Sequence, residues 1–229
     1  MQGPFKVQQE PYPLGRFHAE LSRLAPKFSQ ALQACSLFDR RYLPGEFIMR
    51  QGEQSEHLYL VATGRVSLSS AVHSGRLFQL GEIACQRQIF GEMEFFSATP
   101  VQWNVVAQTE LDASVICAHK LAQRLLAAPE LTLFFAAALA SDYLDTLDIT
   151  TSRLLHPIAY NIAYELWRER QRTPMLGSRK RAHEAARFGT TERVYRRALK
   201  ELIDQGIVQD GEDGPQIADV TRLRHYLAL

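Results

Sequence analysis

The stretch of sequence that decides the fold is PGEFIMRQGEQSEHLYLV, residues 44–61, which is followed by Gly64-Arg65-Val66. Glycines interrupt its apolar runs, and residues 58–61 have the composition of a core strand. Short strands at roughly ten-residue spacing that end in glycine turns are typical of an antiparallel β-barrel or sandwich. The same texture continues beyond this stretch. We therefore predict a β-rich domain over residues 35–128, after a lead-in over residues 1–34 that contains a short helix.

A long helix is predicted to follow the β-rich domain. Between Pro129 and Pro157, apolar or small residues recur at alternating steps of four and three: Leu133, Ala137, Ala140, Leu144, Leu147, Thr151 and Leu154. Such a spacing forms an a/d seam, which is the pattern of a coiled coil. An ordinary core-packing helix has the same pattern, but an exposed helix between two domains usually buries such a stripe against a symmetry mate. We therefore predict that the helix over residues 129–156 forms a parallel homodimer.

The segment over residues 157–229 has the pattern of a helix-turn-helix. Its most informative part is a short helical stretch over residues 181–188, a turn, and a second helix over residues 191–205. Ala185 lies four residues before Gly189, as a tight helix-turn-helix requires. A small residue then lies where the two helices touch, and a glycine is free to take positive φ in the turn.

The second helix presents charged side chains on its predicted outer face, opposite a core face of Val194, Ala198, Leu199 and Leu202. Thr191 is a suitable N-cap, and the outward side chains are Glu192, Arg193, Arg196, Arg197 and Lys200. An arginine can donate two parallel hydrogen bonds to guanine, and a carboxylate can accept one from the amino group of cytosine. Arg181 on the first helix is suited to a phosphate contact. These residues predict a DNA-binding site.

Two further elements are predicted beside the helix-turn-helix. Residues 158–170 have the pattern of an amphipathic helix with Ile162, Leu166 and Trp167 on its apolar face. Beyond Gly206, two short apolar pairs flank a Gly/Pro-containing turn over residues 211–215. This pattern predicts a two-stranded wing.

Positive charge is concentrated in the segment that contains these helices. The whole chain has 26 Lys+Arg and 25 Asp+Glu, which taken alone argues against a nucleic-acid partner. Residues 153–200, however, hold 12 Lys+Arg and 4 Asp+Glu, a net charge of +8, against −3 for residues 1–152 and −4 for residues 201–229. Such a band is the expected footprint of phosphate contact, and a solvated charged surface is the alternative.

Composition excludes several other classes of protein. The longest apolar stretch, residues 131–140, is about half as long as a bilayer span, and the N-terminus lacks a signal-peptide pattern, so a cytoplasmic location is expected. Three cysteines, at positions 35, 85 and 117, fit neither a disulfide framework nor a CxxC metal site, and the seven histidines are scattered. We predict no metal, no cofactor and no membrane contact. No HExxH, GxSxG or Walker motif indicates an enzyme.

The order of β-rich domain, seam helix and winged helix-turn-helix resembles the CRP/FNR superfamily of bacterial transcription regulators. The resemblance covers about residues 40–229 and is strongest over residues 44–66, which are similar to the family's signature in its β-roll. It implies an α+β fold: an N-terminal antiparallel β-roll of the double-stranded β-helix or jelly-roll type, a long dimerisation helix, and a C-terminal winged helix-turn-helix. It also implies a homodimeric, sequence-specific regulator with double-stranded DNA, and RNA polymerase, as partners.

The resemblance is incomplete at two places. Glu192-Arg193 departs from the family's common Arg-Glu order in the recognition helix, which implies a different DNA half-site. Phe90-Gly91-Glu92-Met93 resembles the opening of the family's ligand cassette, in which backbone amides approach a cyclic phosphate and the glutamate holds a ribose hydroxyl. The Arg-Ser/Thr pair that should follow is replaced by Val101 and Gln102 in an ungapped alignment anchored on Ala107.

The missing arginine predicts that this chain does not bind cyclic AMP tightly. No Arg or Lys occurs between Arg87 and Lys120, and a phosphate without its cation loses a charge-assisted interaction of about 1.5 to 3 kcal/mol. Thr146 matches a polar residue that family members place against the adenine. The candidates for an effector pocket, with the effector unknown, are Gly91, Glu92, Val101, Gln102, Trp103 and Thr146.

Other sensing chemistries of the family fit this chain less well. An iron-sulfur sensor needs four thiolates, and the chain has three cysteines. A haem sensor of this family pairs a cysteine with a nearby histidine, and Cys85 has no histidine within ten residues. The main alternative function is a cyclic-nucleotide-binding regulatory module that acts on a protein partner. That alternative leaves the basic band unexplained.

Overall fold

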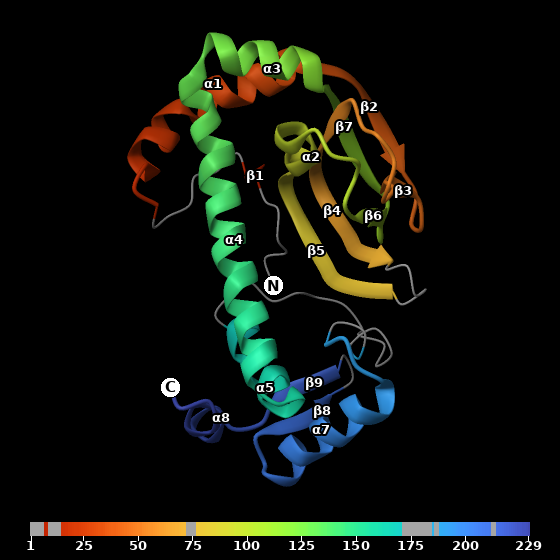
Figure 1. Ribbon diagram of the computed structural model, residues 1–229, viewed down its shortest axis with the longest axis vertical. Coiled ribbons are helices and arrows are strands. Elements are labelled where there is room, and N and C mark those ends of the chain that lie inside the picture. Colours follow the sequence, from red (N-terminus) through yellow and green to blue (C-terminus); the bar gives the residue numbers. More distant parts are fainter. Residues whose placement is uncertain (1–6, 9–14, 72–76, 171–184, 186–187, 212–213) are drawn as a thin grey trace. The chain divides into compact units, whose positions relative to one another are not determined.

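The computed structural model describes residues 7–8, 15–71, 77–170, 185, 188–211 and 214–229 (Figure 1). The chain folds into two compact units. The roll unit contains residues 3–70 and 82–146, and the C-terminal unit contains residues 147–229 with residues 71–81. Together they confirm the predicted order of an antiparallel β-roll, a long helix and a C-terminal helical domain with a two-stranded sheet.

The roll is a seven-stranded antiparallel sheet that curls on itself. Its long central strand β4 pairs with β7 through residues 57–61 and with β6 through residues 66–69, while β1 and β3 lie at the ends of the main path. The strands are β1 (Val7–Gln8), β2 (Ser36–Tyr42), β3 (Phe47–Met49), β4 (His57–Ala71), β5 (Leu77–Phe90), β6 (Asn104–Ala107) and β7 (Leu111–Cys117).

Two glycines that were expected to end strands lie inside them instead. Gly64 is within β4 and Gly81 within β5, with φ of 130° and 138°. A Cβ on Gly64 would lie 2.8 Å from the Cβ of Leu111 on the crossing strand, so this position bends the strand around its neighbour. The prediction of short strands closed by glycine turns is therefore wrong here, because these glycines produce curvature rather than termination.

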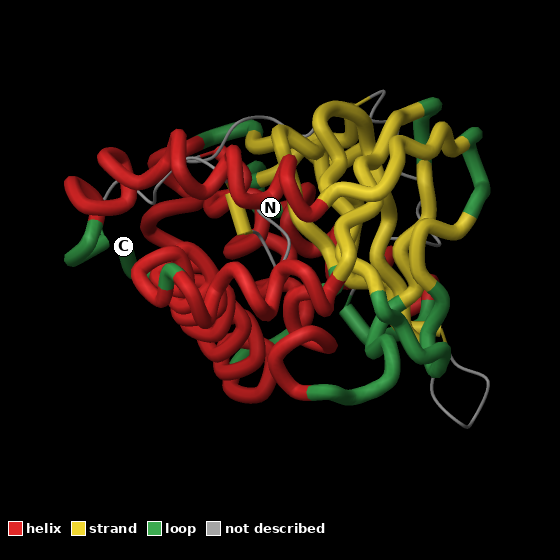
Figure 2. Tube along the Cα trace, turned by 90° about the horizontal axis from the view of Figure 1, so that it is seen from above, coloured by secondary structure: helices red, strands yellow, loops and turns green. Residues whose placement is uncertain are grey.

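The lead-in is a core element of the roll. It forms the 18-residue helix α1 (His18–Cys35), longer than the short helix predicted, and buries Leu21, Leu24 and Phe28. The ring of Phe28 stacks on Phe134 at 4.1 Å and meets Phe135 edge-on at 5.6 Å. Figure 1 shows α1 beside α3 (Ala118–Ala127), and Figure 2 shows the strands of the roll curled together.

The predicted seam helix is present as α4 (Thr132–Leu155), which begins after the 3-10 turn η1 (Pro129–Leu131). Among the described residues no single helix is long and apolar enough to span a membrane. Within the part of the chain that the structure describes, one pair of helical segments, α3 with η1–α4, passes that test of length and composition, and the pair is bent by 116°.

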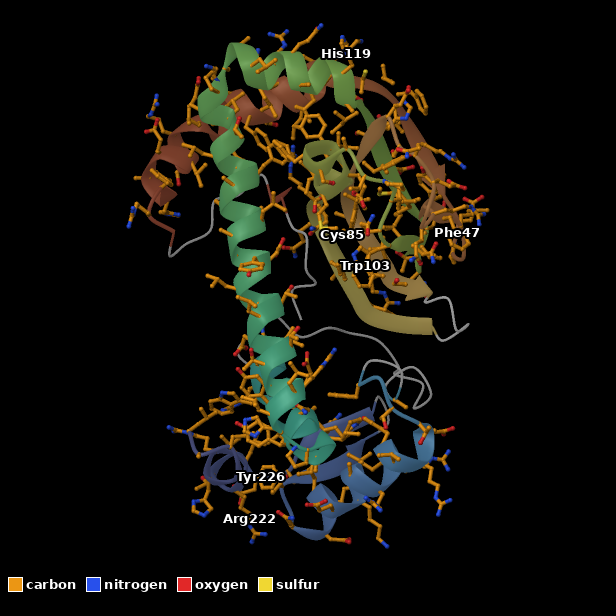
Figure 3. The ribbon with its side chains drawn as sticks, in the orientation of Figure 1. Phe47, Cys85, Trp103, His119, Arg222 and Tyr226 are labelled. Carbon is orange, nitrogen blue, oxygen red and sulfur yellow. The ribbon has the colours of Figure 1, made fainter. Side chains whose placement is uncertain are left out.

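The C-terminal unit contains the helices predicted over residues 158–170 and 191–205 and the predicted pair of strands, together with a last helix that was not predicted. Its core is made by α5 and α7 with the two-stranded sheet and the last helix, and the ring of Tyr226, which Figure 3 labels, lies near that of Tyr160. The predicted turn residues 212–213 lie outside the described residues. The elements are α5 (Ile158–Arg170), α7 (Glu192–Asp204), β8 (Val208–Gly211), β9 (Gly214–Ile217) and α8 (Val220–Tyr226).

Candidate nucleic-acid interface and effector pocket

The turn of the helix-turn-helix has the predicted backbone. Gly189 has φ of 61°, and the amide N–H groups of Phe188 and Thr190 both donate to the carbonyl of Ala185, at 3.2 and 3.1 Å. The Ala185 side chain is buried. Thr191 then caps α7, because its Oγ1 accepts from the N–H of Val194 at 3.4 Å. The first helix, including Arg181, lies outside the described residues apart from Ala185.

The faces of α7 are divided as predicted with one correction. Ala198, Leu199 and Leu202 are buried, but the predicted core residue Val194 is 38% exposed and Tyr195 is buried in its place. The helical period explains the difference, since positions 195, 198, 199 and 202 lie on one face and position 194 lies at its edge. The Tyr195 ring packs near Phe188, with centroids 5.8 Å apart.

The opposite face of α7 is basic and open to solvent. Arg193, Arg196, Arg197 and Lys200 are all exposed. Arg196 forms an ion pair with Glu192 one turn before it, so two of the predicted base-reading side chains hold each other in the free protein. The basic face of α7 therefore consists of Arg193, Arg197 and Lys200 together with Arg196, which is held in an ion pair with Glu192.

A hydrogen-bonded joint fixes the end of α4 to α5. The hydroxyl of Tyr164 donates to Oδ2 of Asp148 at 2.8 Å, and Arg168 donates to the same oxygen at 3.0 Å. Burial, followed by the hydrogen bond to Asp148, raises the pKa of Tyr164 to about 12. At the break between the helices, Asn161 Nδ2 donates to the carbonyl of His156 at 3.0 Å, and Asn161 Oδ1 accepts from Ser152. We did not predict this joint from the sequence, because single polar residues in a helix have no periodic signal.

The a/d seam of α4 lies largely on its solvent face. Leu133 and Ala137 pack partly against the roll core, whereas Leu144, Leu147 and Leu154 are 66%, 43% and 80% exposed. The residues that α4 buries are instead Phe134, Phe135, Ala138 and Asp142. One face of α4 thus packs into the protein core, and a second, apolar face is not covered by any residue that the structure describes.

The predicted effector pocket is nearly closed. A cavity of about 20 Å³ remains at the start of α2 (Glu92–Ser97), which is room for about one water molecule. Three of the predicted pocket residues, Gly91, Glu92 and Trp103, line it. Trp103 is labelled in Figure 3. The rest of its wall is mostly apolar and comprises Met49, Leu68, Phe90, Met93, Glu94 and Val105.

The other three predicted pocket residues do not line this cavity. Val101 is buried, and its backbone pairs with the turn at Gly52 and Glu53 through two hydrogen bonds of 2.8 Å. Gln102 is exposed, and its backbone N–H donates to Oε1 of Glu94 at 2.8 Å. Thr146 is exposed on α4.

Glu92 is the unusual group of the pocket. It is the first residue of α2, because Gly91 takes a φ of 94° and turns the chain into the helix. The residue is 1% exposed, and within the described chain neither carboxyl oxygen has a hydrogen-bond partner. Burial raises the pKa of Glu92 well above its ordinary value; the residue's own backbone N–H acts to lower it, and the charges of Glu94 and Asp142 act to raise it.

Of the groups that line this cavity, the Glu92 carboxyl could accept from a ribose hydroxyl, and none of the lining residues is a cation. Among the described residues, no group of His, Cys, Asp and Glu is arranged to hold a metal ion.

Comparison with known proteins agrees with the architecture. Residues 39–127 match the cyclic nucleotide-binding domain family. A regulator with c-di-GMP response, CLP of Xanthomonas campestris, superimposes with a TM-score of 0.71 at 19% identity, over 85% of this chain and 100% of that one. The chain has the CRP/FNR fold. A CRP/FNR-family protein from Eubacterium rectale shows the same fold with a TM-score of 0.68 at 15% identity, over 95% and 99% of the two chains.

The CRP/FNR fold is shared at low sequence identity. FixK2 of Bradyrhizobium japonicum superimposes with a TM-score of 0.67 at 19% identity, over 82% of this chain and 96% of that one. A search of curated protein sequences finds no match. The CLP and Eubacterium rectale proteins are described as regulators and not as enzymes.

Proposed function

We propose that this protein is a homodimeric, sequence-specific DNA-binding transcription regulator of the cytoplasm. The observation that carries the proposal is α7, which buries one face and presents Arg193, Arg196, Arg197 and Lys200 on the other. The Gly189 turn before it and the β8–β9 wing after it complete the pattern of a recognition helix. Double-stranded DNA is the partner that this surface fits, and RNA polymerase is the expected second partner of such a regulator.

The proposed dimer is formed by the exposed seam of α4. Two parallel copies of this helix would cover Leu144, Leu147 and Leu154, which are otherwise exposed to water. A two-fold dimer presents two α7 helices to successive major grooves about one helical turn apart. The expected DNA site is therefore roughly palindromic.

The DNA proposal is tested by fluorescence anisotropy with the full-length protein and fragments of the DNA upstream of its own coding sequence. Arg193→Ala should weaken binding to the preferred site by about 1 to 3 kcal/mol and relax the base preference. Arg181→Ala should weaken all fragments alike and lower the salt slope by about one. Arg23→Ala removes the same charge from α1 and should change neither. If none of the fragments shows salt-dependent binding, the proposal is contradicted.

The roll is proposed to sense an unidentified effector or none, and not to bind cyclic AMP tightly. The closed cavity and the replacement of the cassette pair by Val101 and Gln102 support this. Titration calorimetry with cyclic AMP at micromolar protein should give no binding heat. Tight binding would contradict our interpretation of Val101 and would favour the alternative, a cyclic-nucleotide-binding module that acts on a protein partner.

A further inference from the structure

A second pocket of the roll unit lies where α1 packs beside α3 and η1 (Figure 1). Its volume is about 430 Å³, which is within the usual range of small-molecule sites, whereas the cavity at α2 has about 20 Å³. The two share no lining residue. The larger pocket is lined by Lys27, Gln30, Ala31, Ala34, Arg124, Ala127, Ala128 and Leu131.

The same residue spacing builds both walls of this pocket. The lining positions of α1 are 27, 30, 31 and 34, and those of the α3–η1 segment are 124, 127, 128 and 131. Positions i, i+3, i+4 and i+7 form one stripe along a helical segment, so two stripes face each other across the pocket. Each stripe begins with a cation and continues into two alanines, whose short side chains leave the space between the segments open.

The pocket has a polar mouth and an apolar floor. Lys27, Gln30 and Arg124 are exposed, whereas Ala31 and Leu131 are 9% and 1% exposed. A ligand can therefore enter from the solvent and place an apolar part against the floor. A few polar groups beside an apolar surface are the usual composition of a small-molecule site.

The two cations of the pocket differ in their partners. The ammonium group of Lys27 donates to Oε1 of Glu130 in an ion pair, and this hydrogen bond lowers the pKa of Glu130. Lys27 is therefore already neutralised by a carboxylate. The guanidinium of Arg124 has no hydrogen-bond or ion-pair partner within the part of the chain that the structure describes. The pocket thus offers one uncompensated positive charge at its mouth.

We propose that this pocket binds a small organic monocarboxylate with a short apolar chain. The guanidinium of Arg124 pairs with the carboxylate through two parallel hydrogen bonds, the geometry that arginine prefers for this group. The chain lies between the alanines of the two stripes, with Leu131 beneath it. A single negative charge matches the single cation that Glu130 leaves uncompensated.

The proposed ligand lies directly before α4. Leu131 is the last residue of η1, and α4 begins at Thr132. A bound carboxylate would link α1 to the segment that leads into this helix. The use of the pocket as the effector site of a transcription regulator rests on the proposed function, whereas the binding itself does not.

The experiment titrates hexanoate into the full-length protein labelled with ¹³C at its alanine methyl groups and follows their NMR signals. We expect saturable shifts of the four methyl groups that line the pocket, those of Ala31, Ala34, Ala127 and Ala128. Acetate has the charge without the chain, and 1-hexanol has the chain without the charge, so both should bind more weakly than hexanoate. For acetate, the loss should be about fourfold for each methylene group that the pocket covers.

Two variants with matched controls test the roles of charge and space. Arg124→Gln should weaken hexanoate binding about tenfold or more, whereas Arg23→Gln, at an exposed arginine of α1 outside the pocket, should leave it unchanged. Ala127→Phe fills the pocket from an exposed position and should abolish binding. Leu126→Phe, at the neighbouring exposed position outside the pocket, should not. Thermal melts check that each variant folds.

Several outcomes would overturn the proposal. They are the absence of a saturable shift, shifts confined to methyl groups outside the pocket, 1-hexanol binding as tightly as hexanoate, and equal weakening by Arg124→Gln and Arg23→Gln. The titrations of the wild-type protein do not depend on whether a variant folds. Because no readout uses DNA, failure of this proposal is distinguishable from failure of the proposed function.

Discussion

Glu92 is a carboxyl group that the roll holds without a hydrogen bond from any described residue. A buried polar group in this state destabilises the fold by about 1 to 3 kcal/mol unless a partner arrives. The neighbouring Glu94 differs, because its Oε1 accepts from the N–H of Gln102 and so closes the loop after α2. The unpartnered Glu92 carboxyl therefore lowers the stability of the fold, whereas the Glu94 carboxyl, two residues later, holds the loop after α2 in place.

Replacing Glu92 by glutamine should stabilise the protein at neutral pH, by about 1 to 3 kcal/mol. The pKa of Glu92 is raised in the folded state, so its contribution is most favourable below its ordinary pKa and is lost as pH rises. The advantage of Glu92→Gln should therefore shrink toward pH 4. Thermal melts of both proteins across pH 4–8 measure it.

Glu94→Gln is the matched control, because it changes a carboxyl that has a hydrogen-bond partner. It should give no stabilisation at neutral pH, since the Gln102 N–H loses its charged acceptor. If Glu92→Gln proves destabilising at pH 7, an unseen partner holds the Glu92 carboxyl.

The ion pair between Glu192 and Arg196 predicts a coupling in DNA recognition. Both side chains are well exposed, so their pairing adds little stability to α7. Glu192→Ala should raise affinity for unrelated DNA, because a negative charge is removed, and should relax preference at one base pair by about 1 to 3 kcal/mol.

A double-mutant cycle measured by fluorescence anisotropy tests this coupling. Arg196→Ala should weaken DNA binding by one factor in the wild-type protein and by a different factor in the Glu192→Ala protein. In the wild-type protein, the loss of Arg196 leaves the Glu192 carboxylate unpaired near the phosphates. Equal factors in both backgrounds would show that the pair has no role in recognition. Unchanged thermal melting of all four proteins is the control for folding.

At the scale of elements, the segments with a strong period were predictable and the irregular ones were not. The sequence pattern located α5 and α7 because their apolar residues repeat every three or four positions. Helix α2 was missed, because six residues are too few to show a period and its start depends on the positive φ of Gly91. The core role of α1 was missed because its partners, Phe134 and Phe135, are a hundred residues away in the chain.

The joint between α4 and α5 makes a prediction about alkaline stability. The pKa of Tyr164 is raised to about 12, so its hydrogen bond to Asp148 is intact below the ordinary tyrosine pKa of about 10 and is lost as pH rises through 12. Tyr164→Phe should lower stability by about 1 kcal/mol at pH 7–9. The difference from the wild type should vanish toward pH 12.

Chemical denaturation at fixed pH values measures this difference, and Tyr143→Phe is the control. Tyr143 is exposed on α4, and its substitution should leave stability unchanged at every pH. A Tyr164→Phe deficit that stays constant to pH 12 would mean that the loss comes from packing and not from the hydrogen bond.

At the scale of the whole molecule, near-neutral composition conceals a separation of charge. The net charge of +8 over residues 153–200 is nearly cancelled by the −3 and −4 of the flanking segments. The exposed arginines of α7 belong to this band. Segment-by-segment counting reveals this basic band and leads to the proposal of a DNA partner, which stays a prediction. The small volume of the cavity beside Glu92 could not be predicted, because it depends on how side chains such as Met49 and Trp103 fill space.

The proposed dimer would link the α4 seam to DNA binding, and this gives the last prediction. Leu144→Glu with Leu147→Glu places charges on an exposed apolar stripe, so the folded monomer should persist while the dimer dissociates. Light scattering after gel filtration should show half the wild-type mass. Affinity for a palindromic site should fall much further than affinity for a half-site, because the second α7 helix of a dimer binds at a high effective concentration once the first is bound, and a monomer has no second helix. Leu126→Glu, at an exposed leucine of α3 outside the seam, should change neither quantity. A double variant that remains dimeric would place the interface elsewhere.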